Sequence, residues 1–261
     1  MPSTSSALLK STHVLSIVLL GCVLPILARP AISQDTASAG SHAEIAGSVS
    51  VTNKGISTTS GSTLGKPAVI FDLSIRHRDL SFEPQFRFGL DGKPWAFLFW
   101  GRYKLLEREK LRINIGAHPA LAFRVMPVAS NGASREVIVA RRYVAGELYP
   151  SYSLTRNIRV GAYYLYSYGV EQGVTKHAQF AASRVSLTNV RISDRYFARL
   201  DPQLSYLRTD DRVGFYLNSG FTLAKRNLPL SISAFVNKPI RTSVLGGEDF
   251  LWNVSLNYSI N

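Results

Sequence analysis

Long stretches of this chain alternate apolar and polar residues, and this two-residue period constrains the fold more than any other feature. In 81–90 (SFEPQFRFGL) the phenylalanines share one face, while Glu83, Gln85 and Arg87 share the other. The same alternation returns in 196–206 (YFARLDPQLSY) and in 250–261 (FLWNVSLNYSIN). Successive side chains of a β-strand point to opposite faces of its sheet. The pattern therefore predicts strands with one apolar and one polar face.

The alternation predicts an all-β chain of about twelve strands with no helix. The expected strands are 44–59, 66–77, 79–90, 94–107, 110–125, 135–155, 157–169, 176–191, 194–208, 212–225, 228–238 and 248–260. Strands of soluble sandwiches are usually about 5–6 residues long, whereas a tilted membrane-crossing strand needs about 9–11. The greater length favours a single-chain antiparallel transmembrane β-barrel over a soluble sandwich, which alternation alone also permits.

The connections between the expected strands differ at the two ends of the barrel. Joins after even-numbered strands are tight, as at 77–79, 156–157 and 226–227, whereas the joins 60–65, 126–134, 170–175 and 239–247 are longer. Short periplasmic turns and longer extracellular loops are typical of outer-membrane barrels. An even number of strands then places both ends of the barrel on the periplasmic side.

The N-terminal segment predicts export. Residues 14–28 (VLSIVLLGCVLPILA) are apolar but shorter than the roughly 20 residues of a spanning helix, so they are typical of a signal-peptide core. Ala31-Ile32-Ser33 predicts cleavage before Gln34, which gives a signal peptide at 1–33, a linker at 34–43 and an outer-membrane barrel at 44–261. A lipoprotein signal ending at Cys22 is the alternative, and the apolar residues 23–27 argue against it.

The two faces of the strands carry different side chains. The residues expected to line the lumen are Glu83, Arg87, Arg102, Lys104, Arg112, Glu147, Arg199 and Asp201. The aromatic residues expected near the ends of the lipid-facing surface are Trp95, Tyr103, Tyr149, Tyr152, Tyr166, Tyr168, Trp252 and Tyr258. Interfacial aromatic girdles of this kind accompany transmembrane barrels.

Arginines outnumber carboxylates on the polar face. Arg87, Arg102, Arg112, Arg141, Arg159 and Arg199 stand against Asp72, Glu83, Glu147 and Asp201. One interpretation is a network of ion pairs that props a narrow lumen, because charges inside a barrel must be paired or hydrated. The other is a basic constriction that favours anions. The two can coexist, with Arg87, Arg102 and Arg199 expected near mid-strand. Nucleic acid is not expected as a partner, because the basic residues are dispersed.

Several blocks of the sequence resemble a family of small Bacteroidetes outer-membrane β-barrel proteins. These blocks are GKPAVIFDLSI (65–75), LSFEPQFRFGLDGKPWAFLFWGRYKL (80–105), GAHPALAF (116–123), VARRYVAGEL (139–148), YYLYSYG (163–169), PLSIS (229–233) and FLWNVSLNYS (250–259). The resemblance implies an outer-membrane location and a single-chain barrel, and it brings no substrate or catalytic residues. The final residues Ser259-Ile260-Asn261 depart from the aromatic end usual in outer-membrane strands.

No motif predicts catalysis, a cofactor or a metal. His118 is interpreted as a hydrogen-bonded lumen residue, and no G-x-S-x-G motif accompanies it. The segment 61–66 (GSTLGK) is one residue too short for a phosphate loop and precedes a strand, so it predicts a hairpin turn. The acidic pairs Asp210-Asp211 and Glu248-Asp249 lack clustered partners. The only cysteine, Cys22, lies in the predicted signal peptide.

These observations favour a narrow channel, or porin-like transporter, for small anionic solutes. The alternative is a structural or interaction barrel with a blocked lumen that supports the cell envelope. A membrane lipid hydrolase or acyltransferase is the weakest of the three hypotheses, because the nucleophile motif is missing. The expected partners are outer-membrane lipid, the outer-membrane assembly machinery and the small anionic solutes.

Overall fold

The computed structural model describes residues 43–57, 63–130, 133–244 and 248–260. The predicted signal peptide (1–33), nearly all of the predicted linker (34–43), and the residues Gly61 and Ser62 of the predicted turn lie outside the described residues. Among the residues that are described, no helix is long and apolar enough to cross a membrane.

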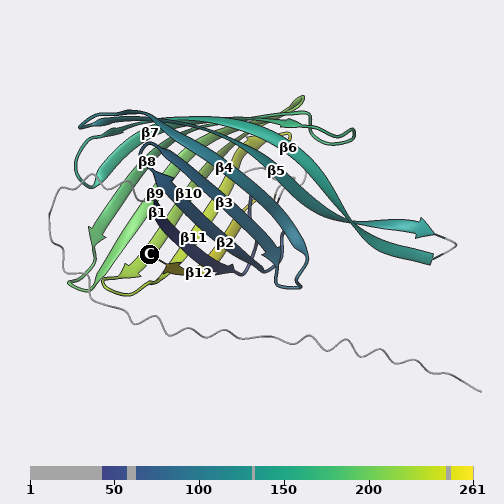
Figure 1. The fold of residues 1–261 in the computed structure, drawn as a ribbon, viewed down its shortest axis with the longest axis horizontal. Coiled ribbons are helices and arrows are strands. Elements are labelled where there is room, and N and C mark those ends of the chain that lie inside the picture. Colours follow the sequence, from purple (N-terminus) through teal and green to yellow (C-terminus); the bar gives the residue numbers. More distant parts are fainter. Residues whose placement is uncertain (1–42, 58–62, 131–132, 245–247, 261) are drawn as a thin grey trace, which may run out of the picture. The chain divides into compact units, whose positions relative to one another are not determined.

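The described residues form a closed antiparallel barrel of twelve strands (Figure 1). The strands are β1 (Glu44–Thr52), β2 (Ala68–His77), β3 (Leu80–Gly89), β4 (Pro94–Glu107), β5 (Leu111–Ser130), β6 (Ala133–Ser153), β7 (Ile158–Gly169), β8 (His177–Arg191), β9 (Tyr196–Thr209), β10 (Arg212–Lys225), β11 (Leu230–Thr242) and β12 (Leu251–Ile260). Each strand pairs with its sequence neighbours, and β1 closes the sheet on β12 with Gly47 opposite Ile260. The predicted fold class is confirmed.

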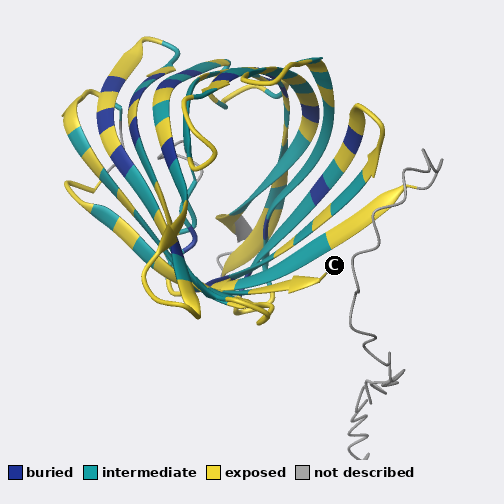
Figure 2. Cartoon of the chain, turned by 90° about the vertical axis from the view of Figure 1, so that its left-hand side faces the viewer, coloured by how far each residue is buried: buried dark blue, intermediate teal, exposed yellow. Residues whose placement is uncertain are grey.

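Along the strands, more buried residues that face the inside of the barrel alternate with more exposed residues that face outward (Figure 2). On β9 and β10, Leu204 and Leu217 are about half exposed on the outer wall. Their neighbours Ser205 and Asn218 point inward and are buried, and Asn218 Nδ2 donates to Ser205 Oγ at 2.7 Å. Large apolar side chains thus cover the outside while polar ones line much of the inside, unlike a domain folded in water.

The connections show the predicted asymmetry at most positions. The joins after even-numbered strands are short, from 78–79 to 226–229, whereas 53–67, 170–176 and 243–250 at the other end are longer. We refer to these ends as the turn end and the loop end. The start of β1 and the end of β12 lie together at the turn end, because Gly47 pairs with Ile260.

The prediction of a loop at 126–134 is wrong. Instead, β5 and β6 continue as a two-stranded ribbon that projects from the loop end (Figure 1). β4 pairs with β5 only as far as Ala122, and β7 pairs with β6 only from Tyr143, so 123–130 and 133–142 pair with each other alone. The segment is rich in β-branched residues, which favour strands, and proline at 127 is tolerated because β5 is an edge strand there.

Two of the eight aromatic residues assigned to the lipid-facing surface point inward instead. Arg87 pairs with Ala96 and Phe88 pairs with Pro94, which leaves Trp95 as the extra residue of a β-bulge. The bulge turns Trp95 into the barrel, where it is 1% exposed. Tyr149 lies two residues from the inward Glu147 and contacts the ring of Tyr163 at 6.0 Å between centroids. The other six are exposed on the outer wall or at its edges, as predicted: Tyr103, Tyr152, Tyr166, Tyr168, Trp252 and Tyr258.

Candidate functional site

The barrel encloses two large cavities that share part of their lining. The loop-end cavity has a volume of about 550 Å³ and is lined by residues from β3 to β10 and the adjoining loops. The turn-end cavity has a volume of about 470 Å³ and is lined by residues from β1 to β5, β7 and β8. Strands such as β1 and β8 are not neighbours in the sheet, so a cavity lined by both lies inside the barrel.

The two cavities meet at a neck, which we define as the residues that line both of them. These are Arg87, Leu98, His118, Leu165 and Phe180. A solute crossing the barrel along the two cavities would pass this neck. Arg87 is the cation there, and its Nε donates to Gln85 Oε1 at 2.6 Å. Gln85 in turn donates to Asp72, so a neutral amide links this arginine to a carboxylate.

Arg102 is the centre of an ion-pair network on the wall of the turn-end cavity. Its Nε donates to Glu147 Oε1 at 2.6 Å, and its Nη1 donates to Glu83. Tyr163 donates to the second Glu147 oxygen at 2.6 Å, and Ser81 donates to Glu83 at 2.7 Å. The Glu147 side chain is only 4% exposed. One arginine thus serves two carboxylates, and the network carries a net negative charge.

A glycine makes room for the Arg102–Glu147 hydrogen bond of this network, which crosses an intervening strand. Arg102 on β4 and Glu147 on β6 are separated by β5, where Gly116 pairs with both of them. A Cβ atom at Gly116 would lie 2.8 Å from Glu147 Oε1 and 3.0 Å from Arg102 Cγ. The absence of a side chain on the inward face therefore lets the two charges meet across an intervening strand.

We expect Gly116→Val to separate Arg102 from Glu147 and to lower the free energy of unfolding by about 3 kcal/mol, because it leaves a buried carboxylate without its cation. Urea unfolding of the barrel in lipid vesicles measures this. Gly101→Val is the control, since a Cβ atom there meets nothing closer than 3.8 Å. Equal losses in the two variants would show that the Arg102–Glu147 pair contributes nothing.

The loop-end cavity has a basic wall. Arg87, Arg124 and Arg141 line it from β3, β5 and β6, and Arg212 lines it from β10. Among the described residues, neither Arg87 nor Arg141 forms an ion pair with a carboxylate. Asp210 and Asp211 also line the cavity, and Asp210 accepts the backbone N–H groups of Lys176 and His177. The arginines outnumber the acids in this cavity.

The structure separates the predicted lumen residues into three places. Glu83, Arg87 and Arg102 line the turn-end cavity, and Glu147 is bonded to that wall. Lys104 and Arg112 lie near the β4–β5 turn, where each is 2.9 Å from Glu107. The prediction that Arg199 lies near mid-strand is wrong. Arg199 lies close to the β8–β9 turn and pairs with Asp201 at 2.6 Å, because β9 begins only at Tyr196.

The candidate residues for other chemistry lie apart from one another. His118 Nδ1 is 3.3 Å from the carbonyl oxygen of Pro119, and its ring lies 3.9 Å from that of Trp100. The imidazole is thus held by a backbone group and an aromatic ring rather than by a serine or a carboxylate. Among the described residues, no three His, Cys, Asp or Glu side chains are grouped as metal ligands would be.

The loop between β7 and β8 contributes to the lining of the loop-end cavity through Gly173–Thr175. Glu171 fastens it to β6 by accepting from the backbone N–H of Arg142 at 2.8 Å and from its Nε at 2.5 Å. These hydrogen bonds lower the pKa of Glu171, so the contact persists at neutral pH and is lost only in acid, as the pH falls through that lowered pKa. The loop is therefore ordered over the cavity.

No family model and no curated protein matches the sequence. Solved barrels of similar fold include the KdgM porin, which is 10% identical over 83% of this chain and 99% of its own, with a TM-score of 0.48. The NanC porin is 12% identical over 82% and 97%, with a TM-score of 0.48. LpxR from Salmonella typhimurium is 10% identical over 82% and 99%, with a TM-score of 0.45. What this chain does is therefore inferred from its own residues.

Proposed function

We propose that this chain is an outer-membrane channel for small anionic solutes. The location follows from the outer wall, where large apolar side chains surround a sheet that leaves no unpaired edge around the barrel. Hydrocarbon tolerates such a surface, whereas water does not, and closure satisfies the backbone polar groups. Export through a cleaved signal peptide at 1–33, and membership of the Bacteroidetes family that the sequence resembles, belong to the same proposal.

The observation that carries the channel proposal is the pair of cavities meeting at Arg87. Together they extend from residues near the turn end, such as Ala46, to residues at the loop end, such as Asp211. The cation at the neck forms no ion pair with a described carboxylate, and the loop-end cavity holds more arginines than acids. A positive potential inside low-dielectric walls raises the local concentration of anions.

The Arg102 network favours the second candidate, a structural barrel. It ties β3, β4, β6 and β7 together through buried charges, as a prop for a narrow lumen would. Both roles fit one barrel if the network stabilises the wall while Arg87 and the loop-end arginines set the potential. His118 lies against Pro119 and Trp100, so the hydrolase hypothesis gains no support from the described residues.

We expect the refolded full-length mature barrel to form steady single channels in a planar lipid bilayer, because the cavities meet at the neck. Enlarging the neck by Phe180→Ala should raise the conductance, whereas Phe215→Ala, on the outer wall, should leave it unchanged. A correctly folded barrel that conducts nothing, with or without the enlarged neck, would favour the structural barrel. Recovery of the native protein as a soluble periplasmic monomer would contradict the location.

A further inference from the structure

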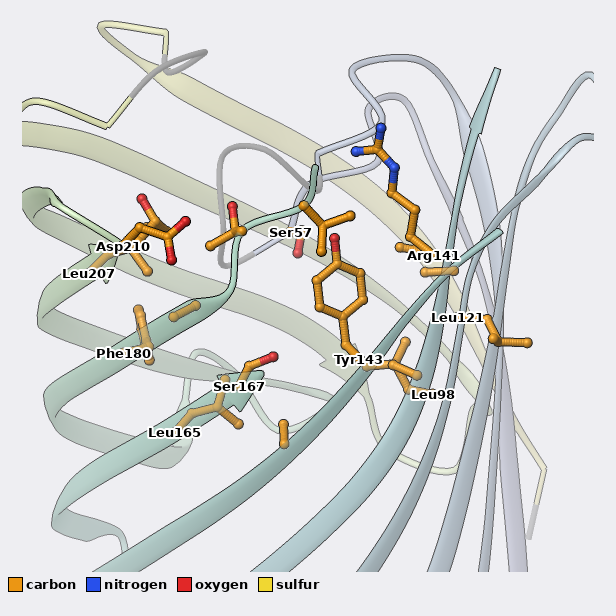
Figure 3. A pocket seen from close by; sticks show the side chains of 18 of the residues that line it. Ser57, Leu98, Leu121, Arg141, Tyr143, Leu165, Ser167, Phe180, Leu207 and Asp210 are labelled. Atoms are coloured by element: carbon orange, nitrogen blue, oxygen red, sulfur yellow. The ribbon is translucent and has the colours of Figure 1, made fainter. Parts of the chain in front are cut away.

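The loop-end cavity has two walls of different chemistry. Arg87, Arg124 and Arg141 form the basic wall on β3, β5 and β6. An apolar wall of Leu165, Phe180, Leu207 and Val244 comes from β7, β8, β9 and the connection after β11. Figure 3 shows Arg141 and Tyr143 across the cavity from Phe180 and Leu207.

The apolar wall is a packed cluster rather than scattered side chains. Phe180 and Leu207 are buried together with Ala182 and Tyr216, and Leu165 and Val244 pack against this group while staying partly exposed. A channel for hydrated inorganic anions needs only cations and polar groups along its path. Apolar surface beside water is unfavourable, so this wall favours a solute that covers it with apolar surface of its own.

The basic wall can hold an acid group at the other side of the same cavity. Arginine presents a planar fork of donors that matches the two oxygens of a carboxylate. Arg141 forms no ion pair with any described carboxylate, and it lines the cavity beside Tyr143. The cavity volume of about 550 Å³ falls in the range of roughly 300–1,000 Å³ that small-molecule sites occupy.

We propose that the loop-end cavity binds carboxylates that carry a compact apolar body, such as an aryl or branched-alkyl group. The carboxylate lies on the basic wall near Arg141, and the apolar body lies against Leu165, Phe180 and Val244. This inference rests on the proposed function in one respect: it assumes that the bound carboxylate is the anion that the channel transports. Binding itself can be measured without any conduction.

Isothermal titration of the full-length mature barrel in detergent micelles, corrected against empty micelles, tests the inference with benzoate, acetate and benzyl alcohol. We expect benzoate to bind at least tenfold more tightly than either of the others, because only benzoate uses both walls. Arg141→Gln should weaken benzoate binding about tenfold. Arg191→Gln, at the turn end of β8 where the arginine pairs with the exposed Asp194, should leave it unchanged.

The apolar wall is tested separately by Leu165→Ser, with Val244→Ser as a second variant should the first fail to fold. Either should weaken benzoate about fivefold and leave acetate unchanged. Equal affinities for benzoate and acetate, or for benzoate and benzyl alcohol, would overturn the inference. A barrel that conducts chloride without preferring benzoate refutes this inference alone, whereas one that prefers benzoate but does not conduct refutes only the channel.

Discussion

Arg102→Gln is expected to lower the free energy of unfolding by about 3 kcal/mol. The change removes the cation shared by Glu83 and Glu147, and Glu147 is nearly excluded from solvent. Breaking a buried pair by deleting one partner leaves an uncompensated charge in a region of low dielectric. Urea unfolding from lipid vesicles at neutral pH gives the value.

Two further variants identify the cause of that loss. Arg184 lies on the same face but donates to the neutral Gln203 at 2.7 Å, so Arg184→Gln should cost only about 1 kcal/mol. Adding Glu83→Gln and Glu147→Gln to Arg102→Gln removes every charge of the network and should restore most of the stability. If the triple variant were no more stable than Arg102→Gln alone, unpaired charge would not be the reason.

Leu256→Arg is expected to lower the free energy of unfolding from lipid by about 2–4 kcal/mol, the cost of an arginine near the bilayer midplane. Leu256 is 53% exposed on the outer wall of β12, where a guanidinium would face hydrocarbon. Its neighbour Ser255 points inward, so Ser255→Arg places the same group in the lumen and should cost much less. Equal losses at the two positions would contradict the assignment of the inner and outer faces.

The strand pattern could be predicted from the sequence because alternation depends on the strand itself. Segments such as 81–90 and 196–206 alternate strictly, and the ends of their strands lie within two residues of the predicted ends. The strand predictions failed at two places, where a bulge interrupts the alternation and where a proline lies within a strand. The bulge at Trp95 adds one residue and reverses its face, which no count of alternating positions reveals. The β5–β6 ribbon was hidden by Pro127, which is compatible with an edge strand but resembles a loop residue.

The candidate site could be predicted only in part, because it depends on which strands lie opposite each other. Glu83, Arg87, Arg102 and Glu147 were assigned to the inner face from their phase alone. Their partition into an ion-pair network of net negative charge and a cation at the neck follows from the register. Gly116 gave no signal in the sequence, since its role is to leave space between residues of two other strands. The apolar wall was missed because Phe180 and Leu207 point into a lumen that was expected to be polar.

Charge selectivity tests the central claim most directly, because it depends on Arg87 and Arg141, which form no ion pair with a described carboxylate. The measurement is the reversal potential of the refolded barrel in a potassium chloride gradient, at a low salt concentration where the Debye length approaches about 30 Å. We predict that chloride is more permeant than potassium. The combined substitution Arg87→Gln and Arg141→Gln should reduce this preference, and Arg191→Gln, at the exposed turn end of β8, should not. A wild-type channel that prefers potassium, or that does not discriminate between the two ions, would contradict the account.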